Sequence, residues 1–276
     1  MSLSVVVTTY NRPAALARVL DALAAQTEPP DEVVVADDGS GPETASMLSA
    51  RKGDPFPLLH VWQPDEGFRA ALSRNRAVAA SRGDWLHFLD GDCVPRPHFV
   101  ERARRLSKRG WALAGDRILL SPGLTERIER EALPVHRWSV ATLAGYRLRG
   151  GINRLLPLAY WPWLARRGRR QDDWRLLRTA NVGLHRADFE AVNGFDSSFV
   201  GWGLEDSEFA IRLINSGVRL RSGRLAIGVL HLWHRESPRT ALDRHRSLLE
   251  AAIREGRVRA VQGLAETIAS GAGSVA

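Results

Sequence analysis

The stretch Asp84-Trp85-Leu86-His87-Phe88-Leu89-Asp90-Gly91-Asp92 decides the fold, because an apolar run leads directly into two carboxylates. Its side chains alternate between two faces from residue 85 to residue 89, which predicts a β-strand. Asp90-Gly91 then breaks the strand and leaves both carboxylates at its carboxyl end. Ligands bind at that edge of open α/β sheets, where a carboxylate can hold a divalent cation and the cation a diphosphate. An ordinary Asp-Gly turn is the alternative for the isolated motif.

Three more strands are expected before this one. They are the apolar runs Ser4–Thr9, Glu32–Ala36 and Leu58–Trp62. Helical spacing after Pro13 and from Ala70 to Ala80 predicts intervening helices. The resulting β-α-β-α-β-α-β order favours an α/β fold with a doubly wound, mainly parallel sheet and helices on both faces. The first βα turn lacks Gly-x-Gly-x-x-Gly, so a dinucleotide-binding dehydrogenase is not expected.

The pattern after Pro95 is less regular. Residues 124–178 are rich in Arg, Trp and Pro and are interpreted as a helical insertion. A Gly- and aromatic-rich loop is expected over Phe195–Asp206. Strands are predicted over Trp111–Ala114, Asn181–Leu184 and Arg224–Leu230, and helices over Phe99–Lys108, Glu205–Ser216 with Gly217 as its end, and Leu242–Ile253.

Composition narrows the classes of protein and partner. The 276 residues are 44% hydrophobic and 25% charged, and the net charge of +8 favours anionic partners. No zinc-finger, RNP or helix-turn-helix signature accompanies that charge, so nucleic acid is not expected. Cys93 is the single cysteine, which excludes intramolecular disulfides and suits a reducing cytoplasm. Because an apolar strand begins at Leu3, no signal peptide is expected, and we predict a cytoplasmic protein.

Carboxylates and histidines follow several predicted strands. Asp38 ends the second strand, Asp92 follows the fourth, Asp206 opens a helix, and His231 and His234 lie in His231-Leu232-Trp233-His234. With these residues in place, the chain resembles GT-A fold glycosyltransferases of the inverting family two. Four motifs carry this resemblance: Val7-Thr8-Thr9-Tyr10-Asn11-Arg12, Asp37-Asp38-Gly39-Ser40, Asn75-Arg76-Ala77, and Asp90-Gly91-Asp92 as the family's Asp-x-Asp.

A second resemblance lies further along. Gly194-Phe195-Asp196 and Gly201-Trp202-Gly203-Leu204-Glu205-Asp206 resemble the galactosyltransferase-type carboxyl half of chondroitin-polymerase-like and β-1,4-galactosyltransferase-like enzymes. The two matches cover about 1–115 and 179–235 and imply a Rossmann-like, mixed sheet in a single domain over 1–276. Within it we expect a nucleotide-sugar-binding half (1–115), a variable helical insertion (116–178), an acceptor and catalytic half (179–235) and a C-terminal helical region (236–276).

The resemblance implies roles in donor binding for several residues. Asp38 would accept a hydrogen bond from the uracil N–H, Thr8 and Tyr10 would line the base pocket, and Arg69 would lie in the nucleotide site. Asp90 would contact the ribose or a metal-bound water. Asn11, Arg12 and Gly91 complete the expected donor-binding set. A turn aspartate and a solvated arginine at a helix start are the alternatives for Asp38 and Arg69.

A divalent metal is expected on the donor side. Asp92 would be one ligand and His234 a second, with His231 as a possible third, although a histidine in an apolar run is more often structural. Carboxylate oxygen and imidazole nitrogen suit Mn²⁺ or Mg²⁺ without distinguishing them. The metal would neutralise charge on the departing UDP.

The acceptor side is expected around Asp206. Asp206 would be the general base that takes the acceptor hydroxyl proton, because inversion requires direct attack by that hydroxyl. Glu205 would hydrogen-bond the sugar or acceptor, and Trp202 beside Gly203 would offer a flat apolar face to a sugar ring. The alternative for the two acids is stabilisation of a helix N-terminus.

Together these features predict an inverting, metal-dependent glycosyltransferase. It would move a hexose or N-acetylhexosamine from a UDP-sugar to a glycan or lipid-linked acceptor, and the composition suggests bacterial cell-surface polysaccharide or lipopolysaccharide synthesis. A sugar-phosphate nucleotidyltransferase is the first alternative, but its Gly- and Arg-rich amino-terminal loop with a following Lys is absent. A non-catalytic glycan-binding protein on the same fold is the second.

A peripheral membrane contact is a further hypothesis. Basic flanks around Trp- and Leu-rich surface are typical of interfacial segments, whereas Pro157 and Pro162 interrupt any continuous amphipathic helix. An ordinary insertion packed on the sheet is the alternative. The residues concerned are Arg147, Arg149, Arg154, Arg166, Arg167, Arg169 and Arg170 around Leu155, Leu156, Leu158, Tyr160, Trp161, Trp163 and Leu164.

Overall fold

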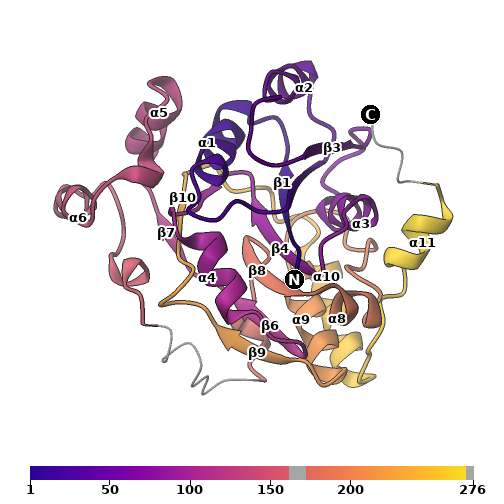
Figure 1. Cartoon of the computed structure of the whole chain (residues 1–276). Helices are drawn as coiled ribbons and strands as arrows, with labels where there is room; N and C mark the ends of the chain where they lie inside the picture. Colours follow the sequence, from indigo (N-terminus) through magenta and orange to yellow (C-terminus); the bar gives the residue numbers. More distant parts are fainter. Residues whose placement is uncertain (162–171, 272–276) are drawn as a thin grey trace.

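The computed structural model describes residues 1–161 and 172–271, with helices packed around a central sheet (Figure 1). The main sheet has seven strands in the order β3-β2-β1-β4-β8-β6-β9. Its strands are β1 (Leu3–Thr9), β2 (Glu32–Asp37), β3 (Leu58–Trp62), β4 (Trp85–Asp90), β6 (Trp111–Ala114), β8 (Asn181–His185) and β9 (Arg219–Ser222). A small sheet in the order β5-β10-β7 contains β5 (Cys93–Val94), β7 (Arg117–Leu119) and β10 (Val229–His231).

The main sheet is mixed and mostly parallel, as the sequence predicts. Strand β1 runs parallel to both β2 and β4, whereas β8 runs antiparallel to β4 and β6. The chain adds β2 and β3 on one side of β1 and then places β4 on the other, which is the doubly wound arrangement. The register pairs Thr8 with Asp90, so the carboxyl ends of β1 and β4 lie side by side at the point where the strand order reverses.

Helices cover both faces of the sheet, also as predicted. One face packs on α1 (Pro13–Ala24), α2 (Pro42–Ser49) and α4 (Phe99–Leu106). The other packs on α3 (Ala70–Ala80), α8 (Arg186–Ala191), α9 (Glu205–Asn215) and α11 (Leu264–Ala269), while α10 (Leu242–Arg254) packs on α9. The alternation in β4 explains this division, because Trp85 and Leu89 join the first core and Leu86 and Phe88 the second.

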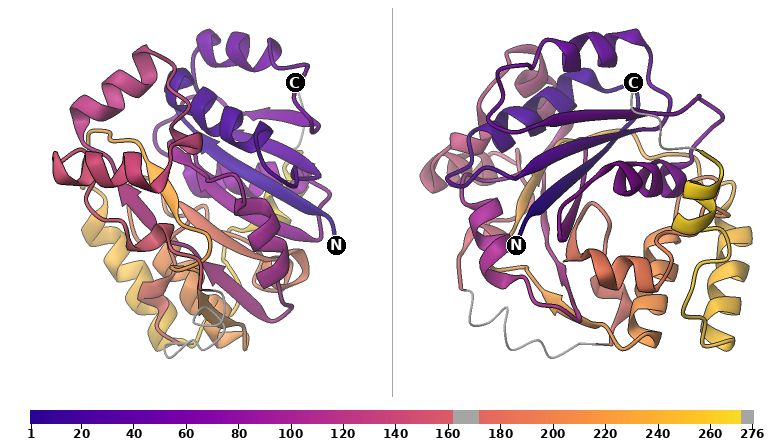
Figure 2. Two further views of the ribbon diagram at one scale, coloured as in Figure 1. Left: turned by 60° about the vertical axis from the view of Figure 1, so that its left-hand side comes forward. Right: turned by 45° about the vertical axis from the view of Figure 1, so that its right-hand side comes forward.

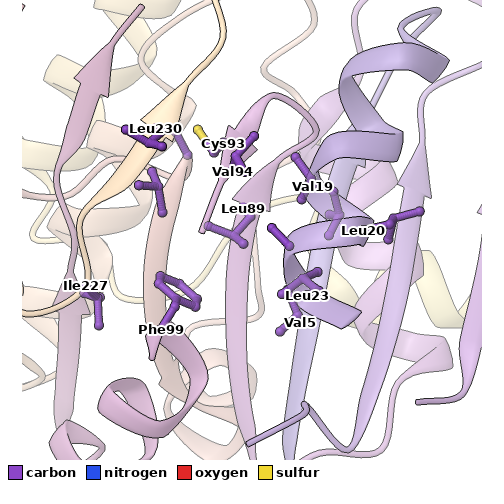
Figure 3. Packing of buried hydrophobic residues seen from close by; sticks show 14 of the residues in the cluster. Val5, Val19, Leu20, Leu23, Leu89, Cys93, Val94, Phe99, Ile227 and Leu230 are labelled. Carbon is purple, nitrogen blue, oxygen red and sulfur yellow. The ribbon is translucent and has the colours of Figure 1, made fainter. Parts of the chain in front are cut away.

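The small sheet extends the first core. Figure 3 shows Cys93 of β5 and Leu230 of β10 close together, with Leu89 of β4 next to them. All three side chains are fully buried. This packing fixes the segment after Asp92 against the segment that carries His231.

After strand β7, the regular elements in the described part of residues 116–178 are all helical, in agreement with the predicted helical insertion. It contains α5 (Pro122–Arg130), α6 (Val140–Leu148) and the short 3-10 helices η1 (Val135–Arg137), η2 (Leu156–Leu158) and η3 (Trp174–Leu176). Both α5 and α6 lie beyond the small sheet, on the side of the molecule opposite α11 (Figures 1 and 2).

The predicted strand Arg224–Leu230 is wrong over most of its length. Residues 224–227 form a turn in which the Ala226 and Ile227 amides donate to the Gly223 carbonyl, and only Val229–His231 is extended. The polar strand β9 was not predicted, because its Arg-Leu-Arg-Ser sequence gives little apolar signal. Arg221 is nevertheless buried there, with its guanidinium 4.7 Å from the Trp111 ring centroid. The short helix α8 was also not predicted, whereas α11 lies within the predicted C-terminal helical region 236–276.

The apolar segment of the membrane hypothesis is divided by the fold. Leu155, Leu158 and Tyr160 pack against the core, whereas Leu156 and Trp161 are 49% and 50% exposed. Trp163, Leu164 and the arginines at 166, 167, 169 and 170 lie outside the described residues. No helix within residues 1–161 and 172–271 has the length and apolar character needed to cross a bilayer.

Candidate active site

Gly91 brings the two carboxylates of Asp90-Gly91-Asp92 against β1. Its N–H donates to the Thr8 carbonyl at 2.7 Å. A Cβ at this position would lie 2.9 Å from the same oxygen, so a larger residue would push the turn away from β1. The glycine is therefore required by close backbone approach, and the turn carries Asp92 on to β5.

Asp92, His231 and His234 come together at this end of the sheet. One nitrogen or oxygen from each lies within 4.8 Å of the others. Nε2 of His231 is 3.4 Å from Oδ1 of Asp92, and Nε2 of His234 is 3.6 Å from Oδ2. Pairing of β5 with β10 sets this geometry, because Cys93 faces His231 in the register and the Leu232 N–H donates to the Asp92 carbonyl at 2.9 Å.

Hydrogen bonding and burial in this cluster suit a divalent cation. Nδ1 of His234 lies 2.9 Å from the Arg235 carbonyl and donates to it, so Nε2 is the ring nitrogen that faces Asp92. Burial lowers the pKa of His231, which favours its neutral, ligating form, although the Asp92 charge opposes the shift. Burial raises the pKa of the neighbouring Cys93 thiol well above its usual value, so Cys93 stays protonated. One carboxylate and two imidazoles fit Mn²⁺ or Mg²⁺.

Arg12, one of the predicted donor-binding residues, also lies at this cluster. Its Nη1 is 2.9 Å from Asp92 Oδ2, and its Nη2 is 2.6 Å from Glu129 Oε1 on α5. Nη2 also donates to the Trp233 carbonyl at 3.2 Å. A carboxylate oxygen of Asp90 also lies within 4.8 Å of one of Asp92. We call Asp90, Asp92, His231, His234 and Arg12 the Asp92 corner.

A second corner contains Glu205 and Asp206 at the start of α9. Leu204, which precedes them, has a φ of 70°, and the flanking Gly201 and Gly203 have φ of 103° and 105°. Left-handed backbone at three of four positions explains the two glycines and turns the helix start toward the sheet. Oδ2 of Asp206 lies 3.7 Å from Nε of Arg178.

Glu205 and Asp206 are close enough for the charge of Asp206 to shift the pKa of Glu205. Burial, and then the charge of Asp206, raise the pKa of Glu205, while the charge of Arg74 lowers it. We call Glu205, Asp206, Arg74 and Arg178 the Asp206 corner.

Arg74 joins the corners and was not predicted. Its side chain is 4% exposed and lies 3.2 Å from Asp90 and 3.4 Å from Glu205, and its Nε donates to Thr8 Oγ1 at 3.0 Å. A signal was present, because Arg74 lies in the middle of the buried face of α3, with Ala71 and Val78. Glu129 and Arg178 were also not predicted, and nothing in their local sequence indicates them.

The half-buried Trp202 lies under a cation, with the Arg239 guanidinium carbon 5.2 Å from its ring centroid. The Gly203 carbonyl is held by Nδ1 of the buried His245 at 2.7 Å. The loop that carries Trp202 is therefore fixed to α10.

The remaining predicted donor residues form a group at the ends of β1 and β2. The two carboxylate oxygens of Asp38 accept from Gln63 Nε2 at 2.5 Å and from the Arg69 N–H at 2.7 Å. Tyr10 is 48% exposed, and its hydroxyl donates to Asp65 at 2.8 Å. The Asn11 side chain accepts from the Gly41 N–H at 2.8 Å. The guanidinium of Arg69 contacts Glu66 at 2.6 Å.

The two parts of the chain that carry the family resemblances, one at Asn75 and the other at Gly194-Phe195-Asp196, are in direct contact. The buried Asn75 side chain accepts from the Phe195 N–H at 2.9 Å and donates to the Phe195 carbonyl at 2.8 Å. Arg212 of α9 forms a fully buried ion pair with Glu208 at 2.7 Å and donates to the Gly194 carbonyl at 2.8 Å. These bonds hold the Gly194-Phe195-Asp196 loop and α9 against α3.

Comparison with known families agrees with this architecture. Residues 4–154 match glycosyl transferase family 2, and residues 167–234 match the N-terminal domain of galactosyltransferase. Because the first match spans more than half of the chain, this protein belongs to glycosyl transferase family 2.

Two relatives and one solved fold illustrate the similarity. Validoxylamine A glucosyltransferase from Streptomyces hygroscopicus subsp. limoneus is 32% identical over 82% of this chain and 51% of its own length. Hyaluronan synthase from Pasteurella multocida is 28% identical over 86% of this chain and 25% of its own length. The chain therefore spans about half or less of these relatives.

Among solved structures, S. aureus TarS 1-349 in complex with UDP superposes with a TM-score of 0.62 at 17% identity, covering 97% of this chain and 68% of that one. The same protein in complex with UDP-GlcNAc gives a TM-score of 0.59 at 16% identity, covering 97% and 69%. At this identity the likeness establishes a shared fold.

Proposed function

We propose that this protein is an inverting, metal-dependent glycosyltransferase that moves a hexose or N-acetylhexosamine from a UDP-sugar to a hydroxyl of a glycan or lipid-linked acceptor. The observation that carries the proposal is the pair of corners at one sheet edge: a carboxylate with two imidazoles, and two adjacent carboxylates, linked through Arg74. The UDP and UDP-GlcNAc complexes of TarS support a UDP-sugar donor.

On the donor side, each residue has a distinct task. Asp92, His231 and His234 would hold a divalent cation, Mn²⁺ or Mg²⁺, which supplies Lewis-acid neutralisation of the diphosphate leaving group. Arg12 keeps the Asp92 carboxylate in place at 2.9 Å. Arg74 orients Asp90, which would contact the ribose. Asp38, Thr8, Tyr10, Asn11, Arg69 and Gly91 would form the rest of the donor site.

On the acceptor side, Asp206 would take the proton of the attacking hydroxyl. A single-displacement reaction needs one base opposite the leaving group and no enzyme nucleophile. The raised pKa of Glu205 favours its protonated form. Protonated Glu205 would donate a hydrogen bond to the sugar or acceptor, and Asp206 would be the base. Trp202 and Gly203 would form the surface on which an acceptor sugar lies.

The chain's organisation follows from these roles. Residues 1–115 would bind the nucleotide sugar, 116–178 would vary with the acceptor, 179–235 would provide the catalytic acids and 236–276 would support them. A setting in bacterial cell-surface polysaccharide or lipopolysaccharide synthesis is supported by relatives such as the hyaluronan synthase of Pasteurella multocida.

UDP release from a panel of UDP-hexoses and UDP-N-acetylhexosamines tests the function. We expect release with one or a few donors in MnCl₂ or MgCl₂ and none in EDTA. Release of pyrophosphate from sugar 1-phosphate and UTP would instead identify a nucleotidyltransferase. Glycan binding with no donor turnover under any metal would identify a non-catalytic binding protein.

Peripheral contact with an anionic membrane on the cytoplasmic side is a second part of the proposal, favoured by the exposed Leu156 and Trp161. Liposome flotation at low salt tests it, with the Leu156→Ser/Trp161→Ser variant expected to float less than wild type. Ile268→Ser removes an apolar side chain that is 57% exposed on α11 and is the matched control. Wild type that never floats would contradict membrane contact.

A further inference from the structure

A cationic cavity of about 320 Å³ lies at the same sheet edge as the two corners. Its lining includes Ala114 at the end of β6, Ser222 at the end of β9 and Asn181 at the beginning of β8. Because β8 runs antiparallel to β6, these three positions share the edge at which β4 delivers Asp90. Its charged lining consists of five arginines, Arg117, Arg154, Arg175, Arg178 and Arg224, and of Asp116.

The positive charge in this cavity exceeds what its neighbours neutralise. Asp116 is shared between Arg154 at 2.6 Å and Arg224 at 3.3 Å. Among residues 1–161 and 172–271, the ion pairs of Arg175 and Arg178 are long, each of 3.7 Å, with Asp173 and Asp206. Within the described chain, no ion pair of the Arg117 guanidinium is found. Several unneutralised guanidinium groups around one concave surface attract an anion, because a low-dielectric wall focuses their field.

The floor of the cavity is rigid. Nδ2 of Asn181 donates to the Ile227 carbonyl at 2.6 Å, and His87 Nε2 lies 3.0 Å from Asn181 Oδ1. A Cβ on Gly115 would lie 2.2 Å from the same amide, so this glycine lets the backbone lie directly on Asn181. These contacts fix the Asn181 amide, and with it the backbone of the cavity floor, before any ligand arrives.

The cavity touches both corners of the active site. Arg178 lies 3.7 Å from the proposed base Asp206. Arg117 begins β7, whose Leu119 is the register partner of His231 in β10. A ligand in the cavity would therefore lie beside the proposed base, on the side of the sheet away from Asp38 and β2.

We propose that this cavity binds an oxyanion of the acceptor, a phosphate or a carboxylate, and so presents an acceptor hydroxyl to Asp206. The inference rests on the proposed function and adds the acceptor's chemical class. Guanidinium groups match both oxyanions through paired N–H donors, and they carry their charge at every working pH. The volume suits about one monosaccharide unit with its charged group, since pockets for larger ligands reach about 1,000 Å³.

Binding of three small probes tests the cavity independently of catalysis. Glucose 6-phosphate, glucuronate and neutral glucose are each titrated by calorimetry into protein saturated with UDP and Mg²⁺. We expect one or both anions to bind at least about tenfold more tightly than glucose, because hydrogen bonds to charged groups are strong. The stronger of the two anions distinguishes a phosphate-bearing acceptor from a uronate-bearing one.

Matched variants locate the binding. Arg117→Gln/Arg224→Gln should weaken the anionic probes about tenfold or more and leave UDP affinity unchanged. Arg109→Gln, an exposed arginine outside the cavity, should change neither. Thermal unfolding of each variant confirms that it is folded, and Arg117→Lys/Arg224→Lys should recover part of the anion binding.

Several results would overturn the inference. Glucose that binds as well as the anions would do so, as would anion binding that the double variant leaves intact. A double variant that loses UDP affinity would move the diphosphate into this cavity. If wild type fails to bind UDP yet binds the anions through these arginines, the proposed function fails while the cavity remains an oxyanion site.

Discussion

The Asp92 corner and the Asp206 corner use the same chemical group for different purposes. At the Asp92 corner, one carboxylate meets a guanidinium at 2.9 Å and two imidazoles at 3.4 and 3.6 Å. At the Asp206 corner, two adjacent carboxylates meet guanidinium groups only at 3.4 and 3.7 Å. The first places the Asp92 carboxylate beside one guanidinium and two imidazole nitrogens, while the second places two acids side by side.

This difference indicates how one sheet edge can hold a metal and also a proton acceptor. A carboxylate that is neutralised from several sides is a good ligand and a poor base. A carboxylate beside another acid takes up a proton more readily. Arg74 keeps the corners at a fixed spacing, since it reaches Asp90 in one and Glu205 in the other.

Removal of Asp92 should have the largest effect. We expect Asp92→Ala to lower turnover to background, because the two histidines without the anionic carboxylate ligand would hold a divalent cation only weakly. Asp84→Ala, a carboxylate at the opposite end of the same strand, is the control and should keep near-wild-type activity. Near-wild-type turnover of Asp92→Ala in EDTA would disprove the metal role.

Asp206→Asn should come next. It keeps the shape and removes the proton acceptor, so kcat should fall by about 10²–10⁴. UDP affinity, measured in the same buffer, should stay within error of wild type. Asp243→Asn near the start of α10, with its side chain 96% exposed, is the matched control. Parallel losses in UDP affinity and kcat would place Asp206 on the donor side.

Arg74→Lys should have a smaller effect and tests the link between the corners. Lysine keeps the charge but cannot reach Thr8, Asp90 and Glu205 together, and loss of a charge-assisted hydrogen bond predicts a decrease in kcat/KM of about tenfold or more. The decrease should appear in transfer to acceptor and in donor hydrolysis alike. An unchanged kcat/KM with normal thermal stability would show that the corners do not need this bridge.

The smallest expected effect is on stability. The pKa of Glu205 is raised above its ordinary 4.5, so its contribution to stability is present below that value and is lost as pH rises through the raised pKa. Glu205→Gln has no proton to lose. Its Tm relative to wild type should therefore increase by a few degrees, roughly 2–4 °C per kcal/mol, from about pH 4.5 to about pH 8. An equal difference in Tm at both pH values would contradict crowding of charge at this corner.

The two corners also differ in how far the sequence predicts them. The ends of β1 to β4 follow from short apolar runs and, in β4, from alternation, so the positions of Asp38, Asp90 and Asp92 were predicted from their own neighbours. The histidines reach Asp92 through β5 and β10, strands of two and three residues. Such strands have no detectable period, and the histidine pairing came from family resemblance.

The Asp206 corner depends on contacts that no local pattern encodes. Arg178 follows a segment of weak periodicity, and Arg74 meets Glu205 across 131 positions of sequence. Strand β9, which extends the sheet beside this corner, has the mainly polar sequence Arg-Leu-Arg-Ser. Where burial is achieved by arginine packed on an aromatic ring, as for Arg221 on Trp111, hydrophobic periodicity fails to predict the strand.

The dependence of UDP affinity on metal is the most direct test of the central claim, that the Asp92 corner binds the donor metal and the Asp206 corner provides the base. Calorimetry of wild type, Asp92→Ala and Asp206→Asn, each with Mn²⁺ and with EDTA, gives three metal-dependent increments in UDP binding. We predict a large increment for wild type, an equal increment for Asp206→Asn and none for Asp92→Ala. An increment that survives in Asp92→Ala, or disappears in Asp206→Asn, would contradict the assignment of donor metal to one corner and proton transfer to the other.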